Sequence, residues 1–111
     1  SMHRAAVIEA GISMPGEMAG LAGMIEPDHG IVTLVGPAHL ELLGSLDGVA
    51  AEKVKMLTAV RTGGLQVYPV SCAAYAPFRE LANPLVLVPA NEAMVRVAGR
   101  SVVFTVLHRP E

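Results

Sequence analysis

Hydrophobic residues in the first third of the chain alternate between strand-like and helix-like spacing. Residues 4–11 (RAAVIEAG) form an apolar run with Glu9 near its end, which predicts a buried strand. From Met18 to about Glu26 apolar residues recur at helical spacing, with Ser13 as the expected N-cap and Pro27 as the stop. Residues 31–35 (IVTLV) form a second β-branched run. Strand, helix and strand make a βαβ unit, so we expect a parallel sheet.

The rest of the chain continues this alternation and then changes character. Asp47 is expected to cap a helix from about Gly48 to Val60, which Gly63 and Gly64 end. The later patterns predict a third strand at 65–70, a short helix at 73–81, a fourth strand at 84–89 and a hairpin at 93–107 that turns at 98–100. The chain therefore begins as α/β and ends in antiparallel β structure.

Composition narrows the class of protein. The chain has 111 residues, which fits one domain; 52% are hydrophobic, which is too many for a disordered chain. Charged residues interrupt every apolar run before the roughly 18 residues of a membrane span. A net charge of −2 argues against binding to nucleic acid or to a membrane surface. The single cysteine excludes an internal disulfide framework and fits a reducing cytosol, so a cytoplasmic location is expected.

The mean hydropathy of +0.50 is high for a small domain. Small domains bury a smaller share of their surface than large ones. Some apolar surface is therefore expected to face something outside this chain.

Two side chains are placed where ligands gather in open α/β sheets. Glu9 and His39 each follow or end a predicted parallel strand, so they are expected at the same, carboxyl edge of the sheet. One hypothesis makes Glu9 a ligand of Mg²⁺, directly or through water. The alternative places Glu9 on a solvated edge and makes His39 a structural histidine. Glu41, two residues further on, is interpreted as a solvated neighbour.

The remaining polar residues are interpreted as structural. Lys53 lies between Glu52 and Lys55 in a predicted helix, and the three are typical of a solvated helix face. Cys72 has no basic cluster nearby in the sequence and is expected to be a small core residue. No phosphate-binding loop of the form G-x-x-x-x-G-K-[ST] is present in the 111 residues.

Taken together, the motifs resemble the central domain of the Mur ligases. The segments that carry the resemblance are AVIEAG, PGEMAG, GPAHLE and GSLDGVA, and together they span about residues 6–57. The spacing of GPAHLE and GSLDGVA is specific. The resemblance is strongest to the members that add D-alanyl-D-alanine to a UDP-N-acetylmuramoyl-peptide.

The resemblance implies both a fold and a site. The fold would be α/β: a partial central domain with a mostly parallel βαβ sheet and a C-terminal antiparallel hairpin, with residues 1–111 as a single unit. In this family ATP phosphorylates a substrate carboxylate, and an amine attacks the acyl phosphate. By position, Glu9 and His39 match the family's Mg²⁺ ligands. Lys53 matches the lysine that is carbamylated in the family, so its implied role is catalytic.

The chain also departs from the family pattern. The family's phosphate loop lies upstream of the strand with Glu9, and its N-terminal and C-terminal domains have no counterpart here. Residues 67–71 lack the N-x-D motif expected near the nucleotide. A fragment or truncated homologue is therefore expected to be inactive alone. Loss of the phosphate-loop strand should uncover a sheet edge, which predicts a homodimer or larger assembly. A non-catalytic binding or assembly module is the alternative function.

Overall fold

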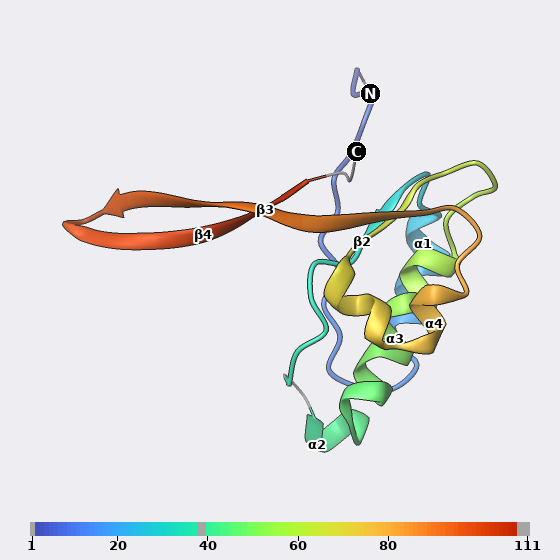
Figure 1. Cartoon of the computed structure of the whole chain (residues 1–111). Coiled ribbons are helices and arrows are strands. Elements are labelled where there is room, and N and C mark those ends of the chain that lie inside the picture. Colours follow the sequence, from blue (N-terminus) through green and yellow to red (C-terminus); the bar gives the residue numbers. More distant parts are fainter. Residues whose placement is uncertain (1, 38–39, 109–111) are drawn as a thin grey trace.

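The structure is a computed structural model that describes residues 2–37 and 40–108. Helices and strands alternate along the chain before it ends in a long hairpin (Figure 1). The elements, in order, are α1 (Glu17–Ile25), β1 (Gly30–Ile31), α2 (Leu40–Leu43), α3 (Leu46–Thr58), β2 (Gln66–Pro69), the 3-10 helix η1 (Val70–Ala74), α4 (Ala76–Arg79), β3 (Pro84–Val97) and β4 (Arg100–His108).

The strands form one mixed sheet in the order β1-β2-β3-β4, in which β1 lies at an edge. The pairs β1–β2 and β2–β3 are parallel, which confirms the expected parallel sheet. β1 is shorter than the predicted run 31–35. Gly64, in the turn before β2, packs against the backbone that leads into β1. A Cβ added to Gly64 would lie 1.9 Å from the carbonyl oxygen of Asp28. Only glycine fits this close approach of two backbones.

The C-terminal hairpin confirms the change to antiparallel structure. β3 continues beyond its pairing with β2 and joins β4 from Val88↔His108 to Val97↔Arg100. The two-residue turn between the strands, Ala98 and Gly99, has positive φ at both positions, 50° and 77°. Two positive φ values suit the right-handed twist of a hairpin. The hairpin projects well away from the helices (Figure 1).

The core lies between α3 and the parallel strands, where α4 closes one end. Phe78 of α4 and Tyr68 of β2 meet edge to face, with ring centroids 5.2 Å apart. The buried members of this cluster are Val32, Ala50, Val54, Leu57, Tyr68, Cys72, Phe78 and Leu81. This core is mostly aliphatic, as the low aromatic content requires. No helix in the described ranges is both long enough and apolar enough to cross a bilayer.

The predicted strand at residues 4–11 is wrong. The segment has no strand assignment, and Val7 and Ile8 are exposed rather than buried. A strand needs a neighbour at about 4.8 Å to pair its backbone groups. Here the space between the segment and β1 is a cavity, so the segment has no such neighbour.

Both long helices form where expected, but their caps differ from the prediction. α1 has Gly16 as N-cap, and Ser13 instead donates from its backbone N–H to the Glu17 carboxylate at 2.7 Å. This bond is the main cause that lowers the pKa of Glu17. α3 is capped by the Ser45 hydroxyl, which accepts from the N–H of Gly48 at 3.1 Å, and Asp47 lies in its first turn.

Candidate functional site

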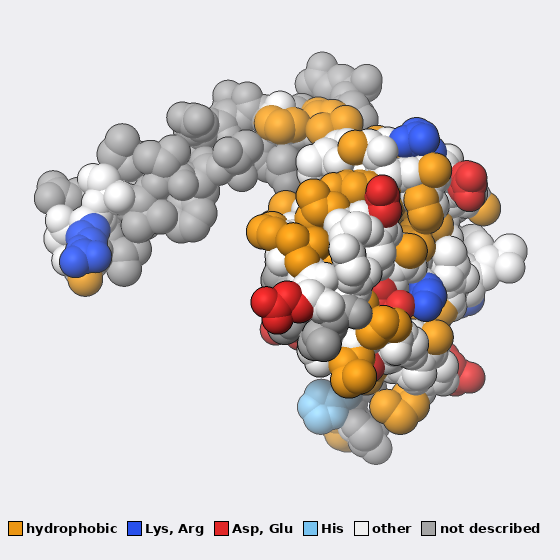
Figure 2. Space-filling view, turned by 90° about the horizontal axis from the view of Figure 1, so that it is seen from below, with side chains coloured by type: hydrophobic (Ala, Val, Ile, Leu, Met, Phe, Trp, Pro, Cys, Tyr) orange, Lys and Arg blue, Asp and Glu red, His pale blue; other side chains and the backbone are white. Residues whose placement is uncertain are grey.

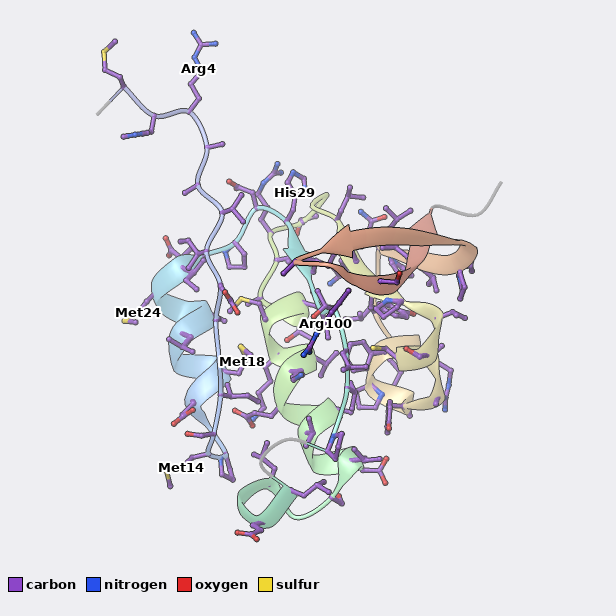
Figure 3. All side chains as sticks on the ribbon, turned by 90° about the vertical axis from the view of Figure 1, so that its left-hand side faces the viewer. Arg4, Met14, Met18, Met24, His29 and Arg100 are labelled. Carbon is purple, nitrogen blue, oxygen red and sulfur yellow. The ribbon has the colours of Figure 1, made fainter. Side chains whose placement is uncertain are left out.

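A cavity of about 1130 Å³ lies between the N-terminal segment and β1. In Figure 3 the chain from Arg4 to Met14 and the chain after His29 run in the same direction on either side of α3. The cavity walls come from residues 3–12 and 25–33, together with Met18 of α1 and one face of α3. Two of the three residues expected at a site from sequence line this one cavity.

Lys53 belongs to the wall that α3 supplies. Val49, Lys53 and Met56 are spaced four and three residues apart, which places them on one face of the helix, and all line the cavity. The ammonium Nζ of Lys53 donates to the carbonyl oxygen of Leu34 at 2.6 Å. Lys53 is thereby tied to the backbone just beyond β1 and is partly buried, so its helix face is not the fully solvated one.

Glu9 reaches the same cavity from the opposite side. Its carboxylate is exposed, and it belongs to the N-terminal segment instead of a paired strand. Glu41 is exposed on α2, as expected of a solvated neighbour. His39 lies outside the described residues. The structure therefore brings Glu9 and Lys53 to one cavity and leaves the position of the third residue undescribed.

The donor set around the cavity does not complete a Mg²⁺ site. Within residues 2–37 and 40–108 no three His, Cys, Asp or Glu side chains are grouped so that they could hold a metal ion. Mg²⁺ demands near-octahedral oxygen coordination, to which Glu9 would contribute one carboxylate. Asp28, another acid of the cavity wall, is paired with Arg61 at 2.9 Å. The described side chains alone are too few for this ion.

The N-termini of the two long helices are already occupied by groups of this chain. Phosphates bind where the first N–H groups of a helix are free. In α1 the N–H of Met18 donates to Glu52 Oε1 at 3.0 Å, and in α3 the Ser45 hydroxyl takes the N–H of Gly48. Neither helix offers the open cradle that nucleotide phosphates need.

Glu52 is the polar residue that sequence reasoning missed. The assignment of Glu52 to a solvated surface is wrong, because only 3% of it is exposed. Burial alone would raise the pKa of Glu52, but the hydrogen bonds from Lys55 and from the N–H groups of Met18 and Gly16 outweigh it, and the pKa is lowered. The sequence offered no signal for this contact, because it indicated Ser13 as the N-cap. In the structure the N-cap is Gly16, which has no side chain to bond the first turn, so α1 needs an acceptor from elsewhere.

Three further polar residues, Cys72, His29 and Gln66, have structural roles. Cys72 is fully buried in the core, as expected, and burial raises the pKa of its thiol. His29 accepts the backbone N–H of Leu65 through Nδ1 at 3.0 Å and so ties the start of β1 to β2. Gln66 is buried with both ends of its amide bonded, to the carbonyl of Leu57 and the N–H of Asn83.

The chain belongs to the Mur ligase family, because the family model for the Mur ligase middle domain matches residues 1–92. The match extends well beyond the motifs of residues 6–57 and ends inside β3. It leaves most of the β3–β4 hairpin outside.

Curated relatives point to one branch of the family. The chain is similar to UDP-N-acetylmuramoyl-tripeptide--D-alanyl-D-alanine ligases from Bacillus subtilis, with 33% identity over 57% of this chain and 14% of that protein, and from Treponema pallidum, with 36% identity over 50% of this chain and 12% of that protein. The Escherichia coli ligase of the same name is 36% identical over 56% of this chain and 14% of that protein. The matched region is thus about one-seventh of each relative. No solved structure matches the chain significantly.

Proposed function

We propose that this chain is part of the ATP-binding domain of a cytoplasmic, ATP-dependent amide ligase of peptidoglycan precursor synthesis. That ligase would add D-alanyl-D-alanine to a UDP-N-acetylmuramoyl-peptide through an acyl phosphate. Membership of the Mur ligase family and the names of the matched relatives support the proposal. The single observation that carries the site is that Glu9 and Lys53, distant in sequence, line the same cavity.

In this proposal Glu9, His39 and Lys53 form one half of a divided metal and phosphate site. Mg²⁺, when bound, neutralises the charge of the reacting phosphates. Glu9 would supply one oxygen ligand and His39 an imidazole. Lys53 would act after carbamylation, because its ammonium alone repels a cation whereas a carbamate attracts one. Its 2.6 Å bond to the carbonyl of Leu34 holds the side chain at the cavity wall, where such a group is needed.

The isolated chain is expected to be inactive. Its long helices have occupied N-termini, and its sequence has no phosphate-binding loop. Positioning of the nucleotide supplies much of the rate in phosphoryl transfer. A chain that holds only part of the site is therefore expected to show no activity. Calorimetry of ATP with Mg²⁺ against this chain should show no heat of binding. Clear binding would contradict the expected inactivity.

A chimeric ligase tests the site itself. Residues 6–57 would replace the matched segment of the Bacillus subtilis ligase, and ADP release would be followed with both substrates present. Glu9→Gln and Lys53→Met should each lower kcat on the order of 100-fold, the cost of losing one charge-stabilising group. The control Glu41→Gln removes an exposed carboxylate from α2 and should leave the rate unchanged. Equal rates in all variants of an active chimera would remove these residues from the site.

A second candidate function is a non-catalytic homologue that acts as an assembly module. The open edge of β1 and the cavity beside it favour this role, because unpaired edges accept further strands. In this role the chain is expected to form a homodimer or a larger assembly in solution. The two functions are distinguished by the gene: a frame that continues upstream of Met2 into a phosphate loop favours the ligase, and a start codon at Met2 favours the module.

A further inference from the structure

We propose that residues 12–26, which include α1, open and close as one unit against the rest of the chain, and that Glu52 is the latch that holds the unit closed. In the open state α1 loses its helix, while α3 and the sheet keep their structure. The inference deepens the ligase function proposed above and rests on it for its consequence. Glu9 lies just before the unit and Lys53 just after the latch, so the proposed site would be complete only in the closed state.

The unit lies outside the main core. The buried cluster between α3 and the sheet begins at Val32 and, within the described part of the chain, includes no earlier residue. α1 packs against α3, and its buried residues are Met18 and Ala22. Figure 3 shows α1 to one side of α3, with Met18 between the two helices and Met24 turned away. Opening of α1 would therefore uncover few buried side chains and leave the core cluster intact.

α1 is too weak a helix to persist once it leaves α3. It has nine residues, and isolated helices shorter than about 12–15 residues are marginal in water. Gly20 and Gly23 weaken it further, although a Cβ added at either position would meet nothing within 4 Å. The packing therefore does not require glycine at these two positions. An undocked α1 would unfold, so docking and helix formation occur together.

Burial of apolar groups alone does not fix the position of the unit. Met24 of α1 is 79% exposed, and Met14, just before the helix, is 54% exposed. Viewed from the side of the helices, the molecule has wide apolar areas with scattered charged side chains (Figure 2). Such areas have no directional preference, so a polar contact of defined geometry is needed to hold α1 in one place.

The carboxylate of Glu52 makes that contact. It is buried and accepts the N–H of Met18 at 3.0 Å, and its other oxygen accepts from Lys55 Nζ at 2.8 Å. The second acid at this end of α1 is Glu17, which accepts the N–H of Ser13 within the unit itself. Of these bonds, those to Glu52 cross from the unit to α3. They are the ones that opening would break.

The unit has a boundary at each end. At the C-terminal end Glu26 has a left-handed φ of 50°, and the next residue, Pro27, accepts the N–H of Arg61 at 3.2 Å. Asp28 also pairs with Arg61, so the chain is tied to the loop after α3 from this point onward. At the N-terminal end Gly11 has open space around it and can absorb a change of direction. Opening would therefore stop at these two points.

Native-state hydrogen exchange tests whether α1 opens as a unit. The N–H groups of Met18, Ala22 and Glu26 lie near the start, in the middle and at the end of α1, and Leu57 is fully buried in α3. The three α1 amides should share one protection factor, at least about tenfold below that of Leu57. Protection that falls from Ala22 towards both ends would indicate fraying of a docked helix and would overturn the inference.

A glycine introduced into α3 separates local opening from unfolding of the whole chain. Ala51→Gly changes an exposed position of α3 and should lower the protection of Leu57 about fivefold. The α1 amides should keep their protection, because α3 stays folded when α1 opens. An equal loss in α1 and at Leu57 would mean that α1 opens only with the whole chain, and the inference would be wrong.

Replacement of the two glycines tests whether opening unfolds the helix. Gly20→Ala combined with Gly23→Ala should raise the protection of the α1 amides about tenfold or more, because alanine favours the closed, helical state. No gain in protection would mean that α1 keeps its helix when it leaves α3, which contradicts the proposed open state.

Substitution of Glu52 tests the latch. Glu52→Ala removes both the acceptor and the charge and should lower the protection of Ala22 and Glu26 about tenfold or more. Glu52→Gln keeps an acceptor and loses the charge, so its effect should be smaller. The matched control Asp47→Asn changes an exposed acid on the same helix and should leave α1 as protected as in the wild type.

Unchanged protection of α1 in both Glu52 variants would show that another contact holds the unit and would overturn the latch. These measurements use the chain without nucleotide. Their failure would therefore leave the ligase proposal standing, which the chimera tests separately.

Discussion

The carboxylate of Glu52 on α3 accepts the backbone N–H of Met18, 34 residues earlier, at 3.0 Å and so caps the first turn of α1. The second oxygen of Glu52 accepts from Lys55 Nζ at 2.8 Å. One buried acid therefore joins the start of α1 to the middle of α3 and keeps its own charge paired. Since the N-terminal segment leads into α1, this contact also fixes one wall of the cavity.

Removal of Glu52 should loosen α1 from the rest of the protein. In Glu52→Ala the N–H of Met18 stays buried without an acceptor, and the charge-assisted bond is lost. We expect a loss of about 2 kcal/mol in the free energy of unfolding, measured by urea denaturation. Asp47→Asn, which changes an exposed acid on the same helix, should cost little. Equal stability of Glu52→Ala and the wild type would show that this bond does not hold α1.

Acid should weaken the protein through the same residue. The pKa of Glu52 lies below its ordinary value of 4.5, so the unfolded state takes up protons first as the pH falls. The stabilisation from Glu52 is complete above pH 4.5 and is lost as the pH drops through the lower folded pKa. The stability difference between the wild type and Glu52→Gln should therefore shrink below pH 4.5.

A thermal melt series from neutral pH downward measures this dependence. Glu41 provides the matched control, because its carboxylate is exposed on α2. The Glu41→Gln curve should run parallel to that of the wild type. A constant difference between the wild type and Glu52→Gln at all pH values would exclude Glu52 as the titrating group.

Much of the fold could be predicted because its signals are local. α3 and β2 formed near their predicted ranges, and the hairpin turned at Ala98 and Gly99, since periodicity and turn residues act over a few positions. The strand at residues 4–11 failed for a physical reason. An apolar run becomes a strand only beside another strand, and here a cavity lies between the segment and β1.

The site was less predictable because it depends on contacts between distant residues. Charge alone placed Glu52, Lys53 and Lys55 together on a solvated face. In the structure Glu52 turns inward to α1 and Lys53 lines the cavity. The spacing of Lys53 with Val49 would have placed it on an apolar face, but the sequence does not show what that face meets. Glu9 was expected beside a ligand space, although not on an exposed segment.

Phe78 should be among the most sensitive core positions. Its ring is fully buried against Tyr68, edge to face at 66°. Phe78→Ala should lower the free energy of unfolding by about 3–5 kcal/mol, because it removes the transfer energy of a ring and leaves a void. The exposed Val70→Ala serves as the control and should change stability by little. A loss below about 1 kcal/mol for Phe78→Ala would mean that the site collapses around the gap.

Cys72 should be chemically silent in the folded protein and reactive after unfolding. Burial raises the pKa of its thiol, and only the thiolate reacts with an aromatic disulfide reagent. At pH 8 the native chain should show almost no colour change over minutes, and one thiol per chain should appear in denaturant. Ser71→Cys/Cys72→Ala moves the thiol to the neighbouring exposed position and should react at once while folded. Fast reaction of the native wild type would mean that η1 opens readily and that the core around Leu57 and Phe78 is less closed than the packing implies.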